Sequence, residues 1–246
     1  MRQPALRLHV REHLAMGWSP AQIAGRLRQE HGRTMISPES IYRFIYHCSA
    51  QKDYWHKLLP KKKSRRGRLG RRGGSPAEHI KRRVSIRQRP AAVDRRKVRG
   101  HWEADLMQFR EYKALLVIHE RRSRLLKVVA EPDREAGPTA DRLLRQFRKL
   151  PKRLRKTVTF DNGTEFALHY QLEDKLGMRT YFCDPHAPWQ KGGIENAIGR
   201  LRRSLPRRTI IAKLKKHQLR KLIANYNNTP RKCLGFKTPV EVFSQS

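Results

Sequence analysis

The clearest indication of the fold is the segment His101–Glu131, HWEADLMQFREYKALLVIHERRSRLLKVVAE. It contains three apolar-rich runs, His101–Gln108, Lys113–Glu120 and Leu125–Glu131, which short polar breaks separate. Runs of this length and composition between polar breaks are typical of strands. The pattern predicts three consecutive strands that pair as an antiparallel meander.

Helices and strands alternate after this meander. Thr139–Leu150 has apolar residues at helical spacing, and Thr157–Phe160 reads as a short strand that ends at Asp161-Asn162-Gly163. Further elements are expected as a helix over Glu165–Leu176, a strand over Thr180–Cys183, and helices from about Gly193 and Ala212. This order predicts an α/β domain of the ribonuclease-H-like type over residues 100–246.

The first 60 residues have a helical pattern instead. Ser19-Pro20-Ala21-Gln22 predicts a capped helix start, and Ser37-Pro38-Glu39-Ser40 repeats the signal. With a first helix over Leu6–Met16, three short helices result, a size and order compatible with an all-α helix-turn-helix DNA-binding domain over residues 1–60. The long connection Gln29–Ile36 leaves a three-helix packing module that does not bind DNA as an alternative.

In this domain the third helix is the expected recognition helix. Its apolar residues face one way, which leaves Ser40, Arg43 and His47 on the outside as candidate DNA contacts.

Residues 61–99 form a strongly basic segment. They hold 17 Lys and Arg residues against the two acids Glu78 and Asp94, together with several glycines. This composition disfavours a packed core and predicts a flexible linker that lies on DNA phosphates. The candidate contacts are Arg65, Arg66, Arg71, Arg72, Arg82 and Arg83, and a solvated hinge is the alternative.

The whole chain has 246 residues, with 57 Lys and Arg against 21 Asp and Glu, a formal net charge of +36. Such an excess makes a nucleic acid the default partner and a membrane surface the weaker one. Three cysteines without a CxxC pair fit a reducing cytoplasm and argue against a zinc site. The apolar runs are too short to span a bilayer, and the N-terminus has no secretion signal. We expect a cytoplasmic protein without a membrane partner.

Three acidic residues are candidates for chemistry. Asp105 lies inside the first predicted strand, Asp161 ends a later strand, and Glu195 lies in the first turn of a helix after Gly192-Gly193. If the two strands are neighbours, their aspartates can share metal ions and Glu195 can complete an oxygen cage, which Mg²⁺ prefers. Each acid also has a plainer explanation, as a turn former for Asp161 or a helix-dipole partner for Glu195.

Three segments resemble the signature blocks of bacterial insertion-sequence transposases of the DDE type, most closely the insertion sequence thirty family. They are Gly100–Asp105 (GHWEAD), Thr159–Phe166 (TFDNGTEF) and Asp184–Asn196 (DPHAPWQKGGIEN). The 33 residues between Asp161 and Glu195 are the spacing associated with the second and third acids of that family. Similarity continues through Tyr226–Gly235 and backward over Trp18–Leu27, so that nearly the whole chain is covered.

The resemblance implies a retroviral-integrase-like catalytic domain in which Asp105, Asp161 and Glu195 are the catalytic metal ligands. It implies Mg²⁺, with Mn²⁺ as a substitute, and no small-molecule cofactor. The enzyme is expected to cleave double-stranded DNA at the ends of its element and to use the freed 3′-hydroxyl to attack target DNA. A homodimer or higher multimer at the bacterial nucleoid is expected, because two element ends must be held together.

Other residues near these blocks receive supporting roles. Glu103 shares a strand face with Asp105 and is the acid most easily mistaken for a metal ligand, while Asn162 and Gly163 shape the turn at Asp161. Expected DNA contacts in the catalytic part are Lys191, Asn196, Arg200, Arg202 and Arg203, with a helix cap (Asn196) and a solvated basic face (the arginines) as alternatives.

The chain departs from the family pattern in two places. Ala104 stands where glycine is common, and the helix-turn-helix that usually precedes the one seen here is missing. Either a shortened variant or an open reading frame called from an internal methionine is expected. A catalytically silent DNA-binding remnant that represses transposition is therefore the main alternative function. A basic RNA-binding protein and a plain ribonuclease-H nuclease are the other rivals.

Overall fold

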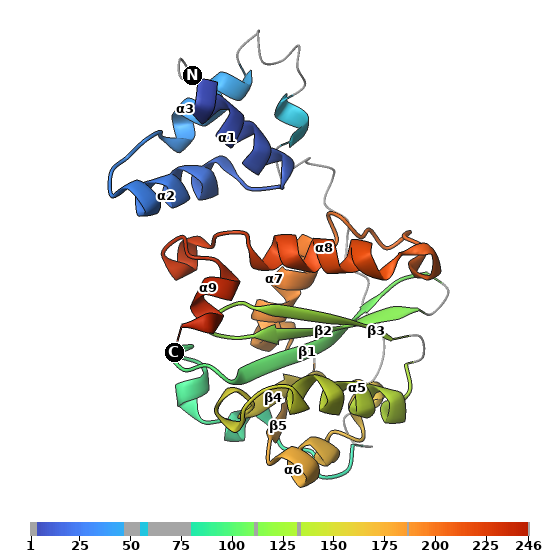
Figure 1. The fold of residues 1–246 in the computed structure, drawn as a ribbon. Coiled ribbons are helices and arrows are strands. Elements are labelled where there is room, and N and C mark those ends of the chain that lie inside the picture. Colours follow the sequence, from blue (N-terminus) through green and yellow to red (C-terminus); the bar gives the residue numbers. More distant parts are fainter. Residues whose placement is uncertain are drawn as a thin grey trace. The chain divides into compact units, whose positions relative to one another are not determined.

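The computed structural model describes residues 4–46, 55–58, 80–110, 113–131, 134–185 and 187–245 (Figure 1). The chain divides into two compact units: residues 1–71 with 228–246 form unit 1, and residues 72–227 form unit 2. The sequence-based boundaries at residues 60 and 100 stay a prediction of where functional domains begin.

Unit 1 is helical. Its described elements are α1 (Pro4–Ala15), α2 (Pro20–His31), α3 (Pro38–Tyr46), a 3₁₀ turn (Trp55–Leu58), a second such turn (Lys232–Leu234) and α9 (Pro239–Ser244). The predicted capping box at Ser19 and Gln22 is present and opens α2. Val10, Leu14, Ile23, Ile41 and Ile45 make a buried core, so the all-α prediction for the N-terminal helices is confirmed.

The C-terminal residues of the chain belong to this same unit. Arg26 of α2 forms an ion pair with Glu241 of α9 at 2.8 Å, and the Gln22 side-chain amide donates to the carbonyl of Pro230 at 2.6 Å. A capping box at Thr238 and Glu241 starts α9. The sequence pattern assigns residues 228–246 to the catalytic part, whereas the structure groups them with the N-terminal helices.

Unit 2 is built on a five-stranded sheet in the order β3-β2-β1-β4-β5. Its strands are β1 (His101–Gln108), β2 (Ala114–Glu120), β3 (Leu126–Glu131), β4 (Thr157–Phe160) and β5 (Arg179–Phe182). The first three pair antiparallel, as the meander predicts, and β4 and β5 run parallel to β1.

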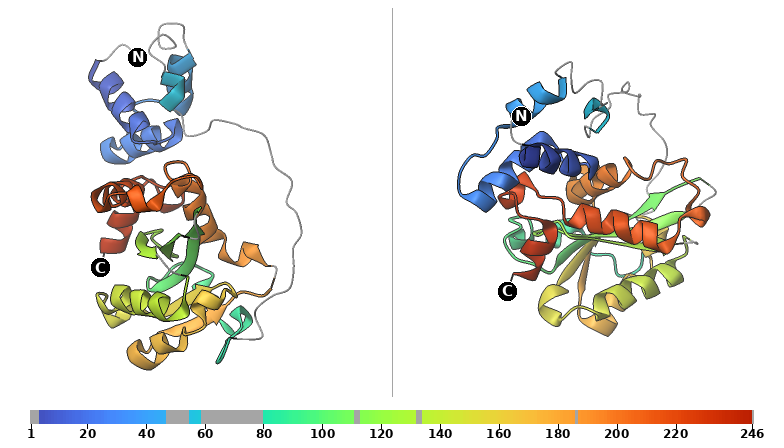
Figure 2. Two further views of the ribbon diagram at one scale, coloured as in Figure 1. Left: turned by 90° about the vertical axis from the view of Figure 1, so that its right-hand side faces the viewer. Right: turned by 45° about the horizontal axis from the view of Figure 1, so that its top comes forward.

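Helices cover both faces of the sheet. On one side lie α5 (Ala136–Arg148) and α6 (Tyr170–Leu176), and on the other lie α7 (Gly192–Leu201) and α8 (Lys216–Asn227), as both sets of views show (Figures 1 and 2). Trp102 of β1 packs edge-on against Phe147 of α5, whereas Met107 belongs to the cluster that includes Ile194 of α7. Trp102 and Met107 therefore face opposite sides of the sheet. An antiparallel meander that two parallel strands extend, with helices on both faces, is the ribonuclease-H-like α/β class that the sequence predicts.

One predicted helix is wrong at its start. The sequence predicts a helix over Glu165–Leu176, but Thr164–Phe166 form a separate 3₁₀ turn and α6 begins only at Tyr170. Glu165 and Phe166 are both buried in this turn. Consecutive buried side chains of this kind do not follow the one-sided pattern of a surface helix.

The second half of the predicted linker is packed on the sheet. Ile80, Ile86 and Val93 are buried, and short 3₁₀ turns occur at Ile86–Gln88 and Ala91–Val93. Other 3₁₀ turns of this unit are Lys152–Leu154, Pro188–Lys191 and Ile211–Lys213. Among the helices that the structure describes, none has the length and apolar character needed to cross a bilayer.

Candidate active site

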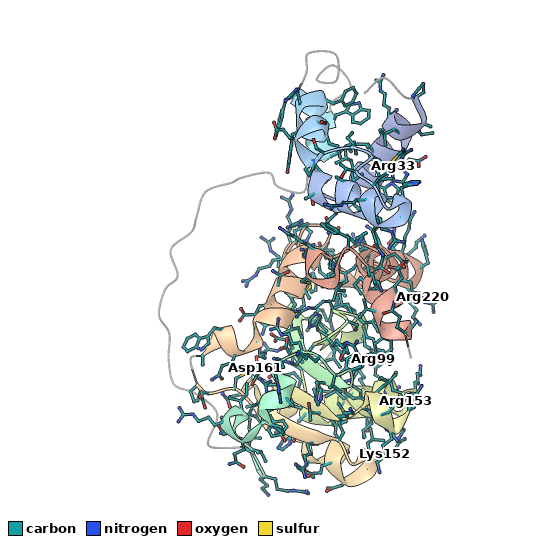
Figure 3. All side chains as sticks on the ribbon, turned by 90° about the vertical axis from the view of Figure 1, so that its left-hand side faces the viewer. Arg33, Arg99, Lys152, Arg153, Asp161 and Arg220 are labelled. Atoms are coloured by element: carbon teal, nitrogen blue, oxygen red, sulfur yellow. The ribbon has the colours of Figure 1, made fainter. Side chains whose placement is uncertain are left out.

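Two neighbouring parallel strands bring Asp105 and Asp161 together. In the register of β1 and β4, His101 lies opposite Thr157 and Glu103 opposite Thr159. Two residues further along, the same offset pairs Asp105 with Asp161. Asp161 directly follows the end of β4. Arg99 directly precedes the start of β1, so Arg99 marks the opposite end of these parallel strands (Figure 3).

The side chain of Lys191 joins the two aspartates. Its Nζ lies 3.0 Å from Oδ2 of Asp105 and 3.1 Å from Oδ2 of Asp161. The Lys191 side chain is only 5% exposed, against 21% for Asp105 and 42% for Asp161. Two carboxylates therefore converge on one buried cation.

Burial and charge act against each other at these groups. Burial raises the pKa of Asp105 to about 6, with Lys191 opposing the rise and the negative charge of Asp161 adding to it. For Lys191, burial disfavours the ammonium, but the two carboxylates outweigh it and hold its pKa above the ordinary value. A positive partner therefore favours the ionised form of Asp105 against its burial.

The turn after β4 is fixed by hydrogen bonds. The Asp161 carboxylate accepts from the backbone N–H of Gly163 at 3.3 Å. Buried Asn162 donates to the carbonyl of Cys183 and accepts from Nε of Arg83, both at 2.9 Å. This arrangement agrees with the predicted role of Asn162 and Gly163 in shaping the turn that carries Asp161.

The arrangement fits a divalent metal ion at Asp105 and Asp161. Mg²⁺ and Mn²⁺ take hard oxygen donors, and the position between the two carboxylates already holds a cation, the Lys191 ammonium. Glu195 lies in the first turn of α7 and its side chain is exposed. Within the described residues, no three His, Cys, Asp or Glu side chains are grouped to hold a metal, so the structure does not bring Glu195 to the pair.

Glu103, the acid that shares a strand face with Asp105, has different partners. Its side chain is 1% exposed and forms an ion pair with Arg121. Oε2 of Glu103 also accepts from the backbone N–H of Ile194 at 2.7 Å. Burial raises the pKa of Glu103, but His119, Arg121 and the Ile194 amide outweigh it and lower the value to about 2. The contacts of Glu103 are thus structural.

The predicted DNA contacts have different surroundings in the structure. Ser40 and Arg43 are exposed on α3, whereas His47, Arg65, Arg66, Arg71 and Arg72 lie outside the described residues. Several of the others hydrogen-bond to the protein itself: Arg82 to Asp174, Arg83 to Asn162, Arg200 to Asn196, and Arg202 to the carbonyl of Gln108. Asn196 and Arg203 are exposed, and Lys191 contacts the aspartates.

Sequence reasoning missed two residues near the site. Trp189, two positions before Lys191, has the most exposed large apolar side chain of the described residues, at 74%. Arg121 was part of a polar break between strands, yet its side chain is 4% exposed. The signal for Trp189 was an aromatic residue in a loop between the second and third acids. For Arg121 no sequence signal separates it from its exposed neighbours.

Comparison with known proteins gives the family. The integrase core domain matches residues 95–188, which include Asp105 and Asp161 and end before Glu195. A transposase of insertion sequence element IS30A from Escherichia coli K12 is 36% identical over 98% of this chain and 64% of its own length. The transposase of IS1086 from Cupriavidus metallidurans is 35% identical over 96% of this chain and 71% of its own length.

Two further similarities extend the comparison. The transposase of IS4351 from Bacteroides fragilis is 35% identical over 98% of this chain and 74% of its own length. The catalytic core of BIV integrase matches 58% of this chain and 93% of its own chain, at 21% identity and a TM-score of 0.46. The chain spans only part of its relatives' length, 64% in the case of the Escherichia coli transposase. With its integrase core domain, the chain belongs to the IS30 family of insertion-sequence transposases.

Proposed function

We propose that this chain is a metal-dependent DNA transposase of the DDE type. It cleaves double-stranded DNA at the ends of an insertion sequence and joins the freed 3′-hydroxyl to target DNA. The observation that carries this proposal is the convergence of Asp105 and Asp161, from two neighbouring parallel strands, on a single buried cation. The alternative of a silent repressor leaves that convergence unexplained.

Asp105 and Asp161 are the proposed ligands of Mg²⁺, with Mn²⁺ as a substitute, and Glu195 is the proposed third ligand. When bound, such ions activate the attacking oxygen and stabilise the leaving oxygen of an in-line displacement at phosphorus. Glu195 reaches the aspartates only through a change at the start of α7, since its exposed side chain lies outside any three-ligand group within the described residues.

Lys191 has two tasks in this proposal. In the absence of metal its ammonium neutralises both aspartates, which keeps two neighbouring carboxylates from repelling each other. A metal ion competes for the same carboxylate oxygens, and the displaced ammonium then has a DNA phosphate as its natural partner. This view combines the predicted DNA contact with the observed ion pairs.

DNA binding is proposed to rest on one face of α3 and on the positive charge of the chain. The exposed face of α3 with Ser40 and Arg43 is the proposed reader of the element ends, and the net charge of +36 draws in the phosphate backbone. Arg65, Arg66, Arg71 and Arg72 remain proposed contacts on the basis of sequence alone. Two or more copies are proposed to act together, since two element ends take part in one event.

The test is an assay with purified protein, supercoiled plasmid and labelled oligonucleotides from the DNA that flanks the gene. Mg²⁺ is expected to support both nicking of the flank and joining of the labelled 3′ end to plasmid, and EDTA is expected to stop both. Nicking without joining would identify a nuclease, and binding without either reaction would identify a repressor.

A further inference from the structure

A buried carboxylate lies beside the candidate active site without belonging to it. Glu103 precedes Asp105 by two residues on the same face of β1, and its side chain is 1% exposed. A buried charge of this kind is strongly unfavourable unless ion pairs and hydrogen bonds satisfy it. The contacts that satisfy Glu103 therefore indicate what it holds in place.

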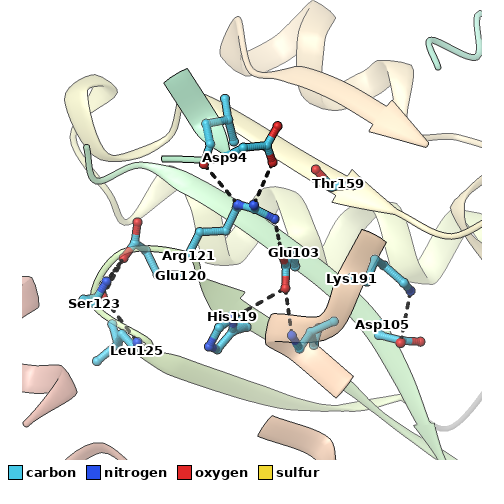
Figure 4. A network of polar contacts seen from close by, with 12 residues as sticks. Asp94, Glu103, Asp105, His119, Glu120, Arg121, Ser123, Leu125, Thr159 and Lys191 are labelled. Atoms are coloured by element: carbon cyan, nitrogen blue, oxygen red, sulfur yellow. Dashed lines mark hydrogen bonds and ion pairs between the residues drawn. The ribbon is translucent and has the colours of Figure 1, made fainter. Parts of the chain in front are cut away.

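Each carboxylate oxygen of Glu103 has a partner on a different element (Figure 4). Oε1 pairs with the guanidinium of Arg121, whose other end lies 3.1 Å from Asp94. Oε2 accepts the backbone N–H of Ile194 at 2.7 Å, and Nδ1 of His119 is 3.6 Å away. Glu103 thus connects β1 to β2, to the turn after β2, and to the start of α7.

The contact with α7 is directional. Ile194 is in the first turn of the helix, where backbone N–H groups have no partner within the helix. A carboxylate that accepts a hydrogen bond from one of these N–H groups fixes the distance of the helix start from the strand and its rotation about the helix axis. A negative charge at this end also interacts favourably with the helix dipole.

Glycine at position 193 makes this close contact possible. A Cβ atom at Gly193 would lie 2.6 Å from Oε2 of Glu103 and 3.2 Å from Cε1 of His119. At Gly192 and Gly199, in the same helix, an added Cβ would meet no atom within 4 Å beyond its chain neighbours and the nearby backbone of the helix. The tight approach is therefore specific to the point where α7 rests on Glu103.

We propose that Glu103 is a positioning residue that anchors the start of α7 to β1 and thereby sets the geometry of the metal site. Lys191 immediately precedes this helix and Glu195 lies in its first turn. Asp105 is two residues from Glu103 on the same strand face. A shift of the helix start would move Lys191 and Glu195 relative to both aspartates. This inference rests on the proposed metal-dependent function of the site.

The proposed anchor is tested by comparing Gly193→Ala with Gly192→Ala, a matched control on the neighbouring residue. Glu103→Ala, Glu103→Gln and the double variant Glu103→Ala with Gly193→Ala complete the set. Three properties are measured in each: amide hydrogen exchange at the start of α7, the Mn²⁺-induced rise in Tm of the DNA-free protein, and the Mg²⁺ concentration for half-maximal cleavage.

Gly193→Ala and Glu103→Ala are expected to speed exchange at α7, shrink the Mn²⁺-induced rise in Tm, and raise the half-maximal Mg²⁺ concentration by about 10- to 100-fold. Gly192→Ala should match the wild type. Glu103→Gln, which keeps an acceptor for Ile194, should recover most of the metal response. The double variant should be no worse than Glu103→Ala, because the steric conflict is gone.

Two results would overturn the inference. If hydrogen exchange at the start of α7 is unchanged in Glu103→Ala, Glu103 does not anchor the helix. If exchange is faster but the response to Mn²⁺ and Mg²⁺ is unchanged, the anchor does not set the geometry of the metal site. A wild-type protein without any response to Mn²⁺ contradicts the proposed function instead, and the anchor is then decided by hydrogen exchange alone.

Discussion

The ammonium of Lys191 lies 3.0 Å from the carboxylate of Asp105, and both side chains are largely withdrawn from water. The same ammonium lies 3.1 Å from Asp161. This ion pair joins the turn before α7 to the two strands that carry the aspartates. The two carboxylates require a positive charge between them. Either the lysine or a metal ion can supply this charge.

Replacing that lysine should therefore destabilise the metal-free protein. In Lys191→Met, two neighbouring carboxylates lose their positive partner, and we expect a loss of about 3 kcal/mol in the free energy of unfolding. Added Mn²⁺ should restore more stability to this variant than to the wild type. Urea unfolding with and without Mn²⁺ measures both effects. Lys152→Met, at an exposed position, is the control, and equal losses in the two variants would contradict the account.

The exposed face of α3 gives a prediction for DNA binding. Arg43 is exposed next to Tyr42 and Tyr46. Arg43→Ala should weaken binding to the element ends by about 1–3 kcal/mol if the arginine reads a base. If Arg43 contacts a phosphate, the slope of the logarithm of the binding constant against the logarithm of the salt concentration should instead fall in magnitude by about 1. Arg28→Ala, exposed on α2, is the control. Binding curves at several salt concentrations that do not differ between the two variants would exclude α3 as the reader.

The pH dependence of stability should contain a contribution from His101. Burial, together with the nearby Lys156, lowers the pKa of His101 to about 4, and its Nδ1 lies 2.9 Å from Oγ1 of Thr157. Because the unfolded chain takes up this proton at higher pH than the folded one, stability is complete above the ordinary pKa of about 6.5 and falls as the pH drops toward 4.

His101→Gln removes this titration. The variant should lose less stability than the wild type between pH 7 and pH 4, with a difference of up to about 3 kcal/mol. Urea unfolding across this range measures it, and His217→Gln, at an exposed position, should keep the wild-type slope. Parallel curves for wild type and His101→Gln would show that His101 protonates equally in both states.

The sheet could be predicted because its strands carry the signal themselves. The three runs of the meander and Thr157–Phe160 are apolar segments between polar breaks, and the structure reproduces them to within one residue. The start of α6 could not be predicted in this way, since Glu165 and Phe166 are both buried by tertiary packing in a separate turn. The packing of residues 80–99 could not be predicted, because buried Ile86 and Val93 lie in short apolar pieces of a segment whose composition is dominated by arginine and lysine.

The site could be predicted only in part. Asp105 and Asp161 stand out as acids in a basic chain, and their strands are neighbours. Lys191 looked like any basic residue beside glycines, and only the fold shows its ion pairs. Glu103 and Asp105 share one strand face, so their different roles also follow only from the contacts that each side chain makes in the fold. Glu103 meets the Ile194 amide, and that contact connects residues far apart in the sequence.

In the proposed function Asp161 acts as a metal ligand, and its amide variant tests this role. Wild type, Asp161→Asn and the control Asp141→Asn, which removes an exposed carboxylate of α5, are assayed for Mg²⁺-dependent cleavage and for DNA binding. We predict that Asp161→Asn binds DNA like the wild type but does not cleave it, and that Asp141→Asn does both. Mg²⁺-dependent cleavage retained in Asp161→Asn would contradict the account.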